Sequence, residues 1–333
     1  MTEGGGAQRH SLEKLQAWEQ LGFGMFLHFG MSTFVGDEFA DGAADPSVYA
    51  PDRIDADQWC RVAKDAGMKY LVLTAKHVAG HCLWPSKHTD YTVANSANKT
   101  DVGAELADAC AKHGLGLGFY YCSWDNHNRF GTVTAGDVGI FQSTVTREYL
   151  EFQLKQLEEL LTNYGPIFEV WIDIPQVLGM EGRKACYCLC ASLQPDTFVI
   201  MNQGSRSGST LDVEHAWPFD ISTREKQFPE CGRWGQGESG TTRGHGRWYE
   251  LDAPRLSDGE ESGARAYYIP TEVCETIGYH WFHFDEDAPR SPQELSAMRT
   301  LARSRGANLL LNVPPDRAGV IPERAVKALV DSL

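Results

Sequence analysis

A short segment of the chain carries a high density of imidazole and aromatic side chains directly after a predicted buried strand. Residues 70–74 (YLVLT) are mostly apolar or β-branched, and the loop that follows contains Lys76, His77, His81, Trp84, His88 and Tyr91. An α/β enzyme displays its chemistry in this way, because a rigid strand positions functional side chains at its carboxyl end. Imidazoles beside a tryptophan suit a neutral, hydroxylated ligand such as a sugar, whose ring stacks while its hydroxyls are hydrogen-bonded.

Polar or aromatic residues also follow the other predicted strands. In chain order, strands one to five are followed by His28, by His77, by Tyr121 and Trp124, by Asp173 and by Asn202. Because the carboxyl ends of successive strands converge on one mouth of a barrel, we expect these side chains to gather there. Asp173 is the most informative, since it follows the apolar residues 170–172, and a carboxylate in a core strand is costly to bury without a partner.

A lone carboxylate indicates glycosidic-bond hydrolysis only if a second carboxyl group lies nearby. Retaining glycosidases hold two carboxyl groups about 5–5.5 Å apart, one as the nucleophile and one as the acid/base. The later part of the chain supplies the candidates Glu214, Glu225, Glu230, Glu238, Glu250 and Glu272. The sequence alone does not show which of these residues is the second carboxyl group.

Predicted strands and helices alternate along most of the chain. Apolar runs predict strands over residues 22–30, 69–77, 115–123, 167–174, 197–202, 267–274 and 308–313. Apolar periodicity predicts helices over residues 55–66, 101–113, 144–162, 183–193 and 322–333, and a capping box at residues 291–294 opens another helix.

This order of elements predicts an α/β fold, a (β/α)8-like TIM barrel that forms a single catalytic domain over residues 1–333 and becomes irregular after the fifth strand. Residues 204–266 lack a period and are predicted to form a loop-rich insertion near the active site. A doubly wound sheet is the alternative, but no GxGxxG loop follows the first strand.

Composition excludes several classes of partner. The net charge of −15 argues against nucleic acid as a partner. The sequence contains no run of 18 apolar residues, so no membrane span is predicted. The first residues lack the apolar core of a signal peptide, and nine cysteines is an odd count, so we expect a cytoplasmic protein with reduced thiols. His77 and His81 are four residues apart but follow a strand, so the helical zinc motif does not apply, and we expect no metal and no cofactor.

Six blocks of the chain resemble the α-L-fucosidases of glycoside hydrolase family 29. These blocks occupy residues 22–30, 69–93, 114–127, 164–174, 270–281 and 306–322. The resemblance implies a (β/α)8-like barrel and a retaining hydrolase that needs no cofactor. It also implies a small-molecule or oligosaccharide substrate with a terminal fucose, and it leaves the oligomeric state open, a homo-oligomer included.

The resemblance also implies roles for individual residues. Asp173 matches the nucleophile of the family, and the residues expected to bind the sugar or line its pocket are His28, Glu38, His77, Trp84, Tyr121 and Trp171. The acid/base varies in position across the family. Glu225, at the end of residues 220–225 (DISTRE), is the first choice, and Glu272, which resembles the glutamate of a Trp-Glu-x-Cys block, is the second.

Three departures from the family pattern affect the expected sugar specificity. Val78 replaces the second histidine of a pair, Ile174-Pro175 replaces a glycine-containing turn after the nucleophile, and residues 202–205 (NQGS) lack an arginine. His81 could supply the lost hydroxyl contact, and Arg206 or Arg224 the lost arginine. Two alternatives therefore stay open: a hydrolase for a related sugar such as an α-L-galactoside, and a fucose-binding homologue with impaired catalysis.

Overall fold

Eight parallel strands form the centre of the structure. The computed structural model describes residues 6–128, 145–202, 216–229, 242–245, 248–252 and 264–333. The strands are β1 (Phe23–Leu27), β2 (Tyr70–Lys76), β3 (Gly116–Cys122), β4 (Glu169–Asp173), β5 (Phe198–Met201), β6 (Ser222–Glu225), β10 (Thr271–Thr276) and β11 (Asn308–Asn312). Their order in the sheet is β5-β4-β3-β2-β1-β11-β10-β6.

The two edge strands of this sheet meet and close it into a barrel. Ile200 of β5 forms a parallel bridge with Ile221, directly before β6, and the amide of Asp220 donates to the carbonyl of Val199. The predicted (β/α)8-like barrel is therefore confirmed. Continuous burial of β2, β5, β10 and β11 fits a parallel sheet that is covered on both faces.

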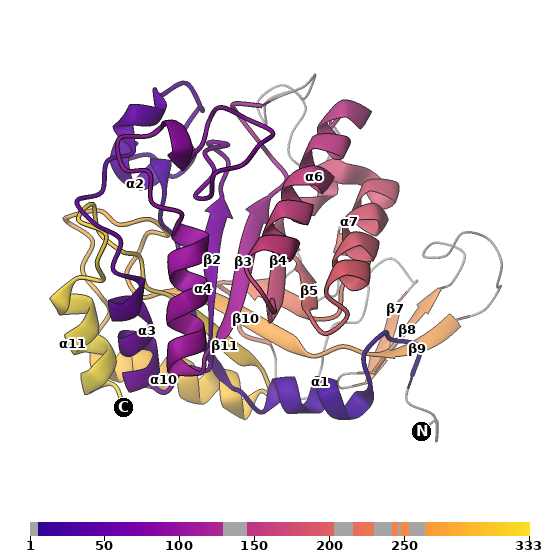
Figure 1. Ribbon diagram of the computed structural model, residues 1–333. Helices are drawn as coiled ribbons and strands as arrows, with labels where there is room; N and C mark the ends of the chain where they lie inside the picture. The colour runs from indigo at the N-terminus through magenta and orange to yellow at the C-terminus, as the bar shows by residue number, and fades with distance from the viewer. Residues whose placement is uncertain (1–5, 129–144, 203–215, 230–241, 246–247, 253–263) are drawn as a thin grey trace.

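Helices cover the outside of the barrel (Figure 1). They are α3 (Ala56–Asp65), α4 (Val102–His113), α6 (Arg147–Asn163), α7 (Gly179–Leu193), α10 (Pro292–Ser304) and α11 (Glu323–Asp331). Asp55, Asp101 and Thr146 cap three of them by accepting a backbone N–H of the first turn. The predicted capping box of Ser291 and Glu294 is present at the start of α10. The caps at Asp55, Asp101 and Ser291 explain why the predicted starts of α3, α4 and α10 agree with the structure, whereas α6 begins after its cap Thr146, three residues later than predicted.

Alternate residues of β4 point into the barrel at three depths. Glu169 lies at the amino end, Trp171 in the middle and Asp173 at the carboxyl end, as the two-residue period of a strand requires. The indole N–H of Trp171 donates across the barrel to Glu272 of β10. Gly24 of β1 leaves room for the ring of Tyr70, since a Cβ at this position would lie 2.5 Å from that ring.

A short helix that was not predicted, α1 (Leu12–Glu19), closes the amino end of the barrel (Figure 1). The indole of Trp18 donates to Glu169, and the Asn308 amide at the start of β11 donates to the Trp18 carbonyl. Arg9, just before the helix, donates to the carbonyl of Thr197 at the start of β5. The opposite, carboxyl end of the strands is thus the one that remains available for a site.

The region predicted to be irregular contains several strands. Within residues 204–266 the structure describes β6, β7 (Thr242–His245), β8 (Trp248–Asp252) and the start of β9 (Ala264–Tyr268), and the last three form an antiparallel sheet. The strand predicted over residues 267–274 is two strands, β9 and β10, separated at Ile269-Pro270. Proline lacks the N–H that a continuous ladder needs. In the described part of the chain, no helix has the length and apolar character to cross a bilayer.

Candidate active site

Asp173 occupies the mouth of the barrel at the last residue of β4. Its Oδ2 accepts from the Tyr120 hydroxyl at 2.5 Å, and its Oδ1 accepts from the Asn202 amide at 2.8 Å and from the Ile174 backbone N–H at 2.9 Å. Burial raises the pKa of Asp173 above its ordinary value, and these three hydrogen bonds reduce that rise. Three donors hold the carboxyl group in one orientation and favour its ionised form.

The turn after Asp173 is held in an unusual backbone conformation. Ile174 has a φ of 49°, in the left-handed region that a β-branched residue rarely adopts. Such a conformation costs about 1–3 kcal/mol and persists where the surrounding structure imposes it. Here it turns the Ile174 N–H onto the Asp173 carboxylate and directs the chain into Pro175.

Glu225 lies beside Asp173 at the end of β6. One amide nitrogen, Nδ2 of Asn202, donates to Oδ1 of Asp173 at 2.8 Å and to Oε2 of Glu225 at 3.1 Å. The two accepting oxygens are therefore at most about 5.9 Å apart. Burial and then the charge of Asp173 raise the pKa of Glu225. The site thus holds two neighbouring carboxyl groups, one with three hydrogen-bond donors and one inclined to keep its proton.

Glu38 reaches the same mouth from the loop after β1. Burial raises its pKa to about 7; the charge of Lys226 and the backbone N–H of Trp281 lower it, while the charges of Glu225 and Asp173 raise it. These neighbours place Glu38 among the groups of the mouth.

Two histidines and a tyrosine line the other side of the mouth. Nδ1 of His28 lies 2.8 Å from Oδ1 of Asn312, and the His28 and His77 rings are 5.8 Å apart in an edge contact. The His77 ring stacks on Tyr120 with centroids 5.6 Å apart. Burial holds the pKa of His28 well below its usual range and lowers that of His77 to about 3. Both imidazoles are therefore neutral near pH 7. In His28 the Nδ1–H donates to the Asn312 oxygen, which leaves Nε2 as a hydrogen-bond acceptor.

The pocket tyrosine is Tyr120, so the assignment of Tyr121 is wrong. The Tyr121 hydroxyl donates to Gln156 of α6, and its ring receives the Lys76 ammonium at 4.2 Å, which places it outside the barrel. Tyr120 is paired in register with Trp171 and stacks on it with centroids 5.6 Å apart. A one-residue error in a strand moves a side chain to the opposite face, and the period of two was the signal that could have identified Tyr120.

Glu272 lies deeper in the barrel than Glu225, and this difference in depth distinguishes the two acid/base candidates. In the ladder of β6 and β10, Glu272 is paired with Thr223, whereas Glu225 is paired with Cys274, two residues nearer the carboxyl edge. Both Glu272 oxygens accept hydrogen bonds, from the Tyr70 hydroxyl at 2.5 Å and the Trp171 indole at 3.0 Å. Glu272 is fully buried under Trp171. The second candidate is thus a core residue, and Trp171 forms the floor under Tyr120.

Trp84 also lies outside the mouth, contrary to the expectation that it lines the pocket. It is 1% exposed, and its indole donates to Glu159 of α6 at 2.8 Å. The tryptophan at the mouth is Trp281, whose ring lies 4.9 Å from that of His28. Its place in the block of residues 270–281 was the available signal in the sequence.

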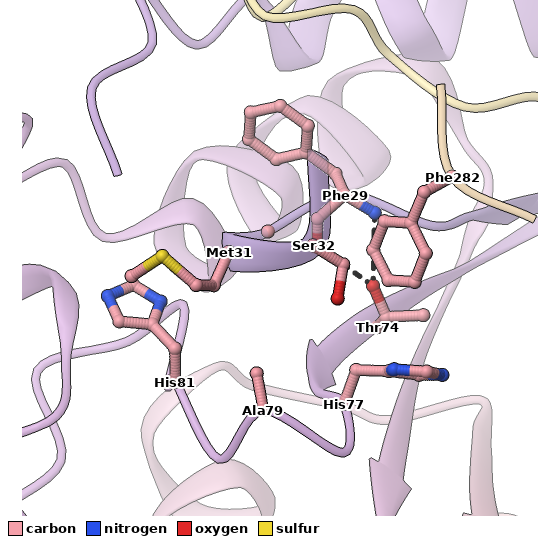
Figure 2. A pocket seen from close by; sticks show the side chains of 9 residues that line it. Phe29, Met31, Ser32, Thr74, His77, Ala79, His81 and Phe282 are labelled. Carbon is pink, nitrogen blue, oxygen red and sulfur yellow. Dashed lines mark hydrogen bonds between the residues drawn. The ribbon is translucent and has the colours of Figure 1, made fainter. Parts of the chain in front are cut away.

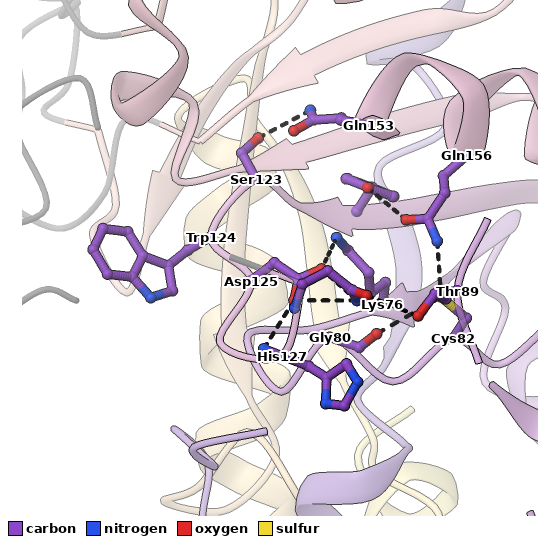
Figure 3. Close-up of polar contacts among 12 residues, drawn as sticks. Lys76, Gly80, Cys82, Thr89, Ser123, Trp124, Asp125, His127, Gln153 and Gln156 are labelled. Atoms are coloured by element: carbon purple, nitrogen blue, oxygen red, sulfur yellow. Dashed lines mark hydrogen bonds and ion pairs between the residues drawn. The ribbon is translucent and has the colours of Figure 1, made fainter. Parts of the chain in front are cut away.

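A buried ion pair fixes the loops around the mouth (Figure 3). The Lys76 ammonium lies 2.7 Å from the Asp125 carboxylate, and both side chains are fully buried. Asp125 also accepts from the backbone N–H of His127. The neighbouring Asn126 donates through its backbone N–H to the Val78 carbonyl and through its side chain to the Ala40 carbonyl. The loop after β3 therefore holds the loops after β1 and β2, including the one that carries Glu38.

A small cavity lies behind the mouth between His77 and His81 (Figure 2). In the same view the Thr74 hydroxyl accepts the backbone N–H of Phe29. Nε2 of His81 bonds to Ser96, and its ring contacts Tyr49 and Tyr91. His81 is therefore a core histidine, and it does not join the His28–His77 pair as the substitute contact that was considered.

The remaining candidates are placed elsewhere or lie outside the described residues. Arg224 is 1% exposed and faces Tyr249, away from the mouth, and Glu250 is exposed on β8. Glu214, Glu230, Glu238 and Arg206 lie outside the described residues. Within the described ranges, no group of three His, Cys, Asp or Glu side chains could hold a metal ion.

Comparisons with known proteins agree with this geometry. The family model described as Alpha-L-fucosidase matches residues 37–332. The chain is 33% identical to "Alpha-L-fucosidase 1" of Arabidopsis thaliana over 96% of its own length and 58% of that protein, and 31% identical to "Putative alpha-L-fucosidase 1" of Oryza sativa subsp. japonica over 94% and 56%. It therefore spans somewhat more than half the length of these relatives.

Solved structures show the same likeness. A putative alpha-L-fucosidase from Bacteroides ovatus aligns with a TM-score of 0.72 at 30% identity, over 96% of this chain and 54% of that one. A putative alpha-L-fucosidase from Bacteroides thetaiotaomicron aligns with a TM-score of 0.73 at 29% identity, over 99% and 67%.

Proposed function

The chain belongs to the alpha-L-fucosidase family, and we propose that it is a retaining α-L-fucosidase that releases fucose from fucosylated glycans or glycosides. One observation carries the proposal: the carboxyl groups of Asp173 and Glu225 accept hydrogen bonds from the same Asn202 amide nitrogen. The resulting limit of about 5.9 Å between oxygens is shorter than the 6.5–9.5 Å spacing of inverting enzymes.

In the first step, an oxygen of Asp173 attacks the anomeric carbon of the fucose. The bond from that carbon to the leaving-group oxygen breaks, and Glu225 gives its proton to that oxygen. The product is a fucosyl ester of Asp173. The raised pKa of Glu225 supports its role as the acid. The three donors on Asp173 orient the nucleophile and favour its ionised form against the effect of burial.

In the second step, water hydrolyses the ester while Glu225 takes up the proton of that water. The charge of Asp173 is one cause of the raised pKa of Glu225, and esterification removes that charge. The pKa of Glu225 then falls, which converts the acid of the first step into the base of the second.

The rest of the mouth suits a deoxy sugar. We assign the sugar hydroxyls to His28, His77 and Glu38. We assign the apolar face and the methyl group to Trp281 and to Phe282, whose ring lies 5.4 Å from that of His28 and 5.0 Å from that of His77. The neutral state of both histidines supports this assignment, because a neutral imidazole keeps a nitrogen that can accept a hydrogen bond from a sugar hydroxyl.

A second candidate is a hydrolase for a related sugar such as an α-L-galactoside. The observation that favours it is at Val78, a buried apolar residue where the family pattern has the second histidine of a pair. The buried His81 does not replace that histidine, because its Nε2 bonds to Ser96. Hydrolysis of a panel of aryl glycosides separates the two. We expect the α-L-fucoside to have the highest kcat/KM, and a higher value for the α-L-galactoside would establish the second candidate.

We also propose a cytoplasmic location. All eight cysteines in the described part of the chain are free, and the Sγ atoms of Cys60 and Cys110 lie 3.8 Å apart without forming a disulfide. Reduced thiols this close support a reducing compartment. Fractionation of the native cells tests this proposal, and recovery of the protein outside the cytoplasm would contradict it.

A further inference from the structure

Lys226 immediately follows the proposed acid/base and extends from the mouth toward solvent. Its φ of 53° is in the left-handed region, so the chain turns sharply where β6 ends. Its backbone N–H still donates to the Cys274 carbonyl of the neighbouring strand at 2.9 Å. The strand ladder therefore continues through Lys226, and its side chain starts from a rigid position next to Glu225.

The ammonium of Lys226 is held over two aromatic rings. It lies 5.2 Å from the centre of the Trp281 ring and 5.8 Å from that of Tyr279, and it donates to the Tyr279 carbonyl at 3.2 Å. An ammonium has three N–H groups, so donors remain for a further partner. The cation and the rings thus form one surface next to Glu225.

Tyr279 is the exposed end of this surface. Its residue is 76% exposed, although its backbone is fixed: the N–H donates to both oxygens of Asp287, at 2.9 and 3.1 Å, and the N–H of His280 donates to the same carboxylate. A side chain at Gly278 would collide with Asp287, since a Cβ there would lie 2.6 Å from Oδ2. An exposed aromatic ring on an anchored turn loses little conformational freedom when it binds a ligand.

The surface is continuous with the proposed fucose pocket. The Trp281 ring lies 4.9 Å from the His28 ring, and its backbone N–H bonds to Glu38. Moving outward, the order is therefore His28, Trp281, Lys226 and Tyr279. Because Lys226 adjoins Glu225, this surface is on the side where the acid/base must meet the leaving-group oxygen.

We propose that Tyr279, Lys226 and Trp281 form the subsite for the first sugar of the leaving group. The apolar face of a pyranose packs against the Tyr279 ring, and the free N–H groups of Lys226 donate to its oxygen atoms. The inference rests on the proposed fucosidase activity and adds the class of its substrate: an oligosaccharide in which fucose is attached to another sugar.

The test compares two substrates that differ only beyond the fucose. An α-L-fucosyl disaccharide fills the subsite, whereas α-L-fucosyl fluoride has no leaving-group sugar. In Tyr279→Ala the ratio of kcat/KM for the disaccharide to kcat/KM for the fluoride should fall about tenfold, the scale of one lost aromatic contact. Tyr279→Phe, the matched control, keeps the ring and should keep the ratio. Lys226→Met should lower the ratio in the same direction.

Two results would overturn the subsite. One is an unchanged ratio in Tyr279→Ala, whether or not activity on both substrates falls equally, and the other is a loss of the ratio in Tyr279→Phe equal to that in Tyr279→Ala. Failure of the fucosidase proposal is a different result: wild-type protein that hydrolyses neither the fluoride nor the disaccharide. If wild-type protein hydrolyses the fluoride but Tyr279→Ala leaves the disaccharide-to-fluoride ratio unchanged, the result contradicts the subsite and leaves the fucosidase proposal intact.

Discussion

The barrel contains two pairs of carboxyl groups at two depths, and they differ in what surrounds them. Asp173 and Glu225 lie at the carboxyl edge and share the Asn202 amide. Glu169 and Glu272 lie near the amino end, fully buried, and bond to core aromatic side chains such as Trp18 and Trp171. Glu169 and Asp173 stand on the same face of the same strand, four residues apart.

A buried carboxyl group with a raised pKa therefore does not by itself identify a catalytic residue. Burial, followed by the charge of Glu272, raises the pKa of Glu169 well above its usual range, and burial raises that of Glu272 to about 7. Both oxygens of Glu272 are occupied and Trp171 covers it. Depth along the strand decides which pair can reach a ligand.

Replacing Asp173 should have the largest effect. Asp173→Asn removes the proposed nucleophile while keeping the shape of the side chain, so kcat/KM for an aryl α-L-fucoside should fall by about 10⁴–10⁶-fold. Asp196, whose side chain is 99% exposed, supplies the matched control Asp196→Asn, which should retain wild-type activity. A folded Asp173→Asn protein with near wild-type hydrolysis would contradict the assignment of catalysis to the pair of carboxyl groups at the carboxyl edge.

Replacing Glu225 should have the next largest effect. Glu225→Gln cannot donate a proton, so hydrolysis of unactivated fucosides should fall by about 10²–10⁴-fold. Because the pKa of Glu225 is raised and its protonated form is the proposed acid, wild-type activity should decline as the pH rises through that pKa. This alkaline decline should disappear in Glu225→Gln. An unchanged profile would assign the acid to another group.

Tyr120 and Tyr121 are adjacent on β3 and face opposite sides of the strand, so substitutions at the two positions compare the inside of the barrel with the outside. Tyr120→Phe removes a hydrogen bond to Asp173, the proposed nucleophile, so kcat/KM should fall about 10–100-fold. That bond lowers the pKa of Asp173, so its loss should move the acidic limb of the pH profile to higher pH. Tyr121→Phe is the matched control, and kinetics in which Tyr121 mattered more than Tyr120 would contradict the assigned faces.

The deep pair should affect stability more than activity. Glu272→Gln keeps an oxygen for Trp171 and a polar partner for Tyr70, so kcat/KM should stay within about threefold of wild type and both pH limbs should remain. Glu272→Leu leaves both donors without an acceptor and should lower the melting temperature clearly. A loss of the alkaline limb in Glu272→Gln would instead make Glu272 the acid.

The same pair predicts how stability changes with pH. The pKa of Glu272 rises from 4.5 to about 7 on folding, so the folded state favours the protonated form. Its contribution is fully present below pH 4.5 and is lost as the pH rises to about 7. Denaturant unfolding at several pH values should show this decrease in wild type and a smaller one in Glu272→Gln. Equal slopes in both proteins would contradict the raised pKa.

Sequence patterns predicted most of the barrel because local signals define its elements. Apolar runs marked seven of the eight barrel strands, and Asp55, Asp101 and Ser291 marked helix starts. The sixth strand (β6) lies within residues 204–266, which were predicted to be loop-rich, because its sequence STRE has no apolar run. Its burial is a tertiary effect that propensity does not contain.

The site was predictable where position on a strand decided it. Asp173 ends an apolar strand, and the structure brings Glu225, Glu38, His28 and His77 to the same mouth. Trp84 was misassigned because residue type does not say which side of a loop faces the barrel, and its partner Glu159 lies 75 residues away. Glu272 was not separable from Glu225, because the register between β6 and β10 is a long-range property.

Covalent trapping tests the central claim most directly. Incubation with 2-deoxy-2-fluoro-α-L-fucosyl fluoride should inactivate the protein. The fluorine at C2 slows both steps, while the fluoride leaving group at C1 keeps formation of the ester faster than its hydrolysis. Peptide mapping should then find one fucosyl label, on Asp173 at the carboxyl end of β4. A label on any other residue, or full turnover of α-L-fucosides by a protein that the reagent never labels, would contradict the mechanism built on Asp173.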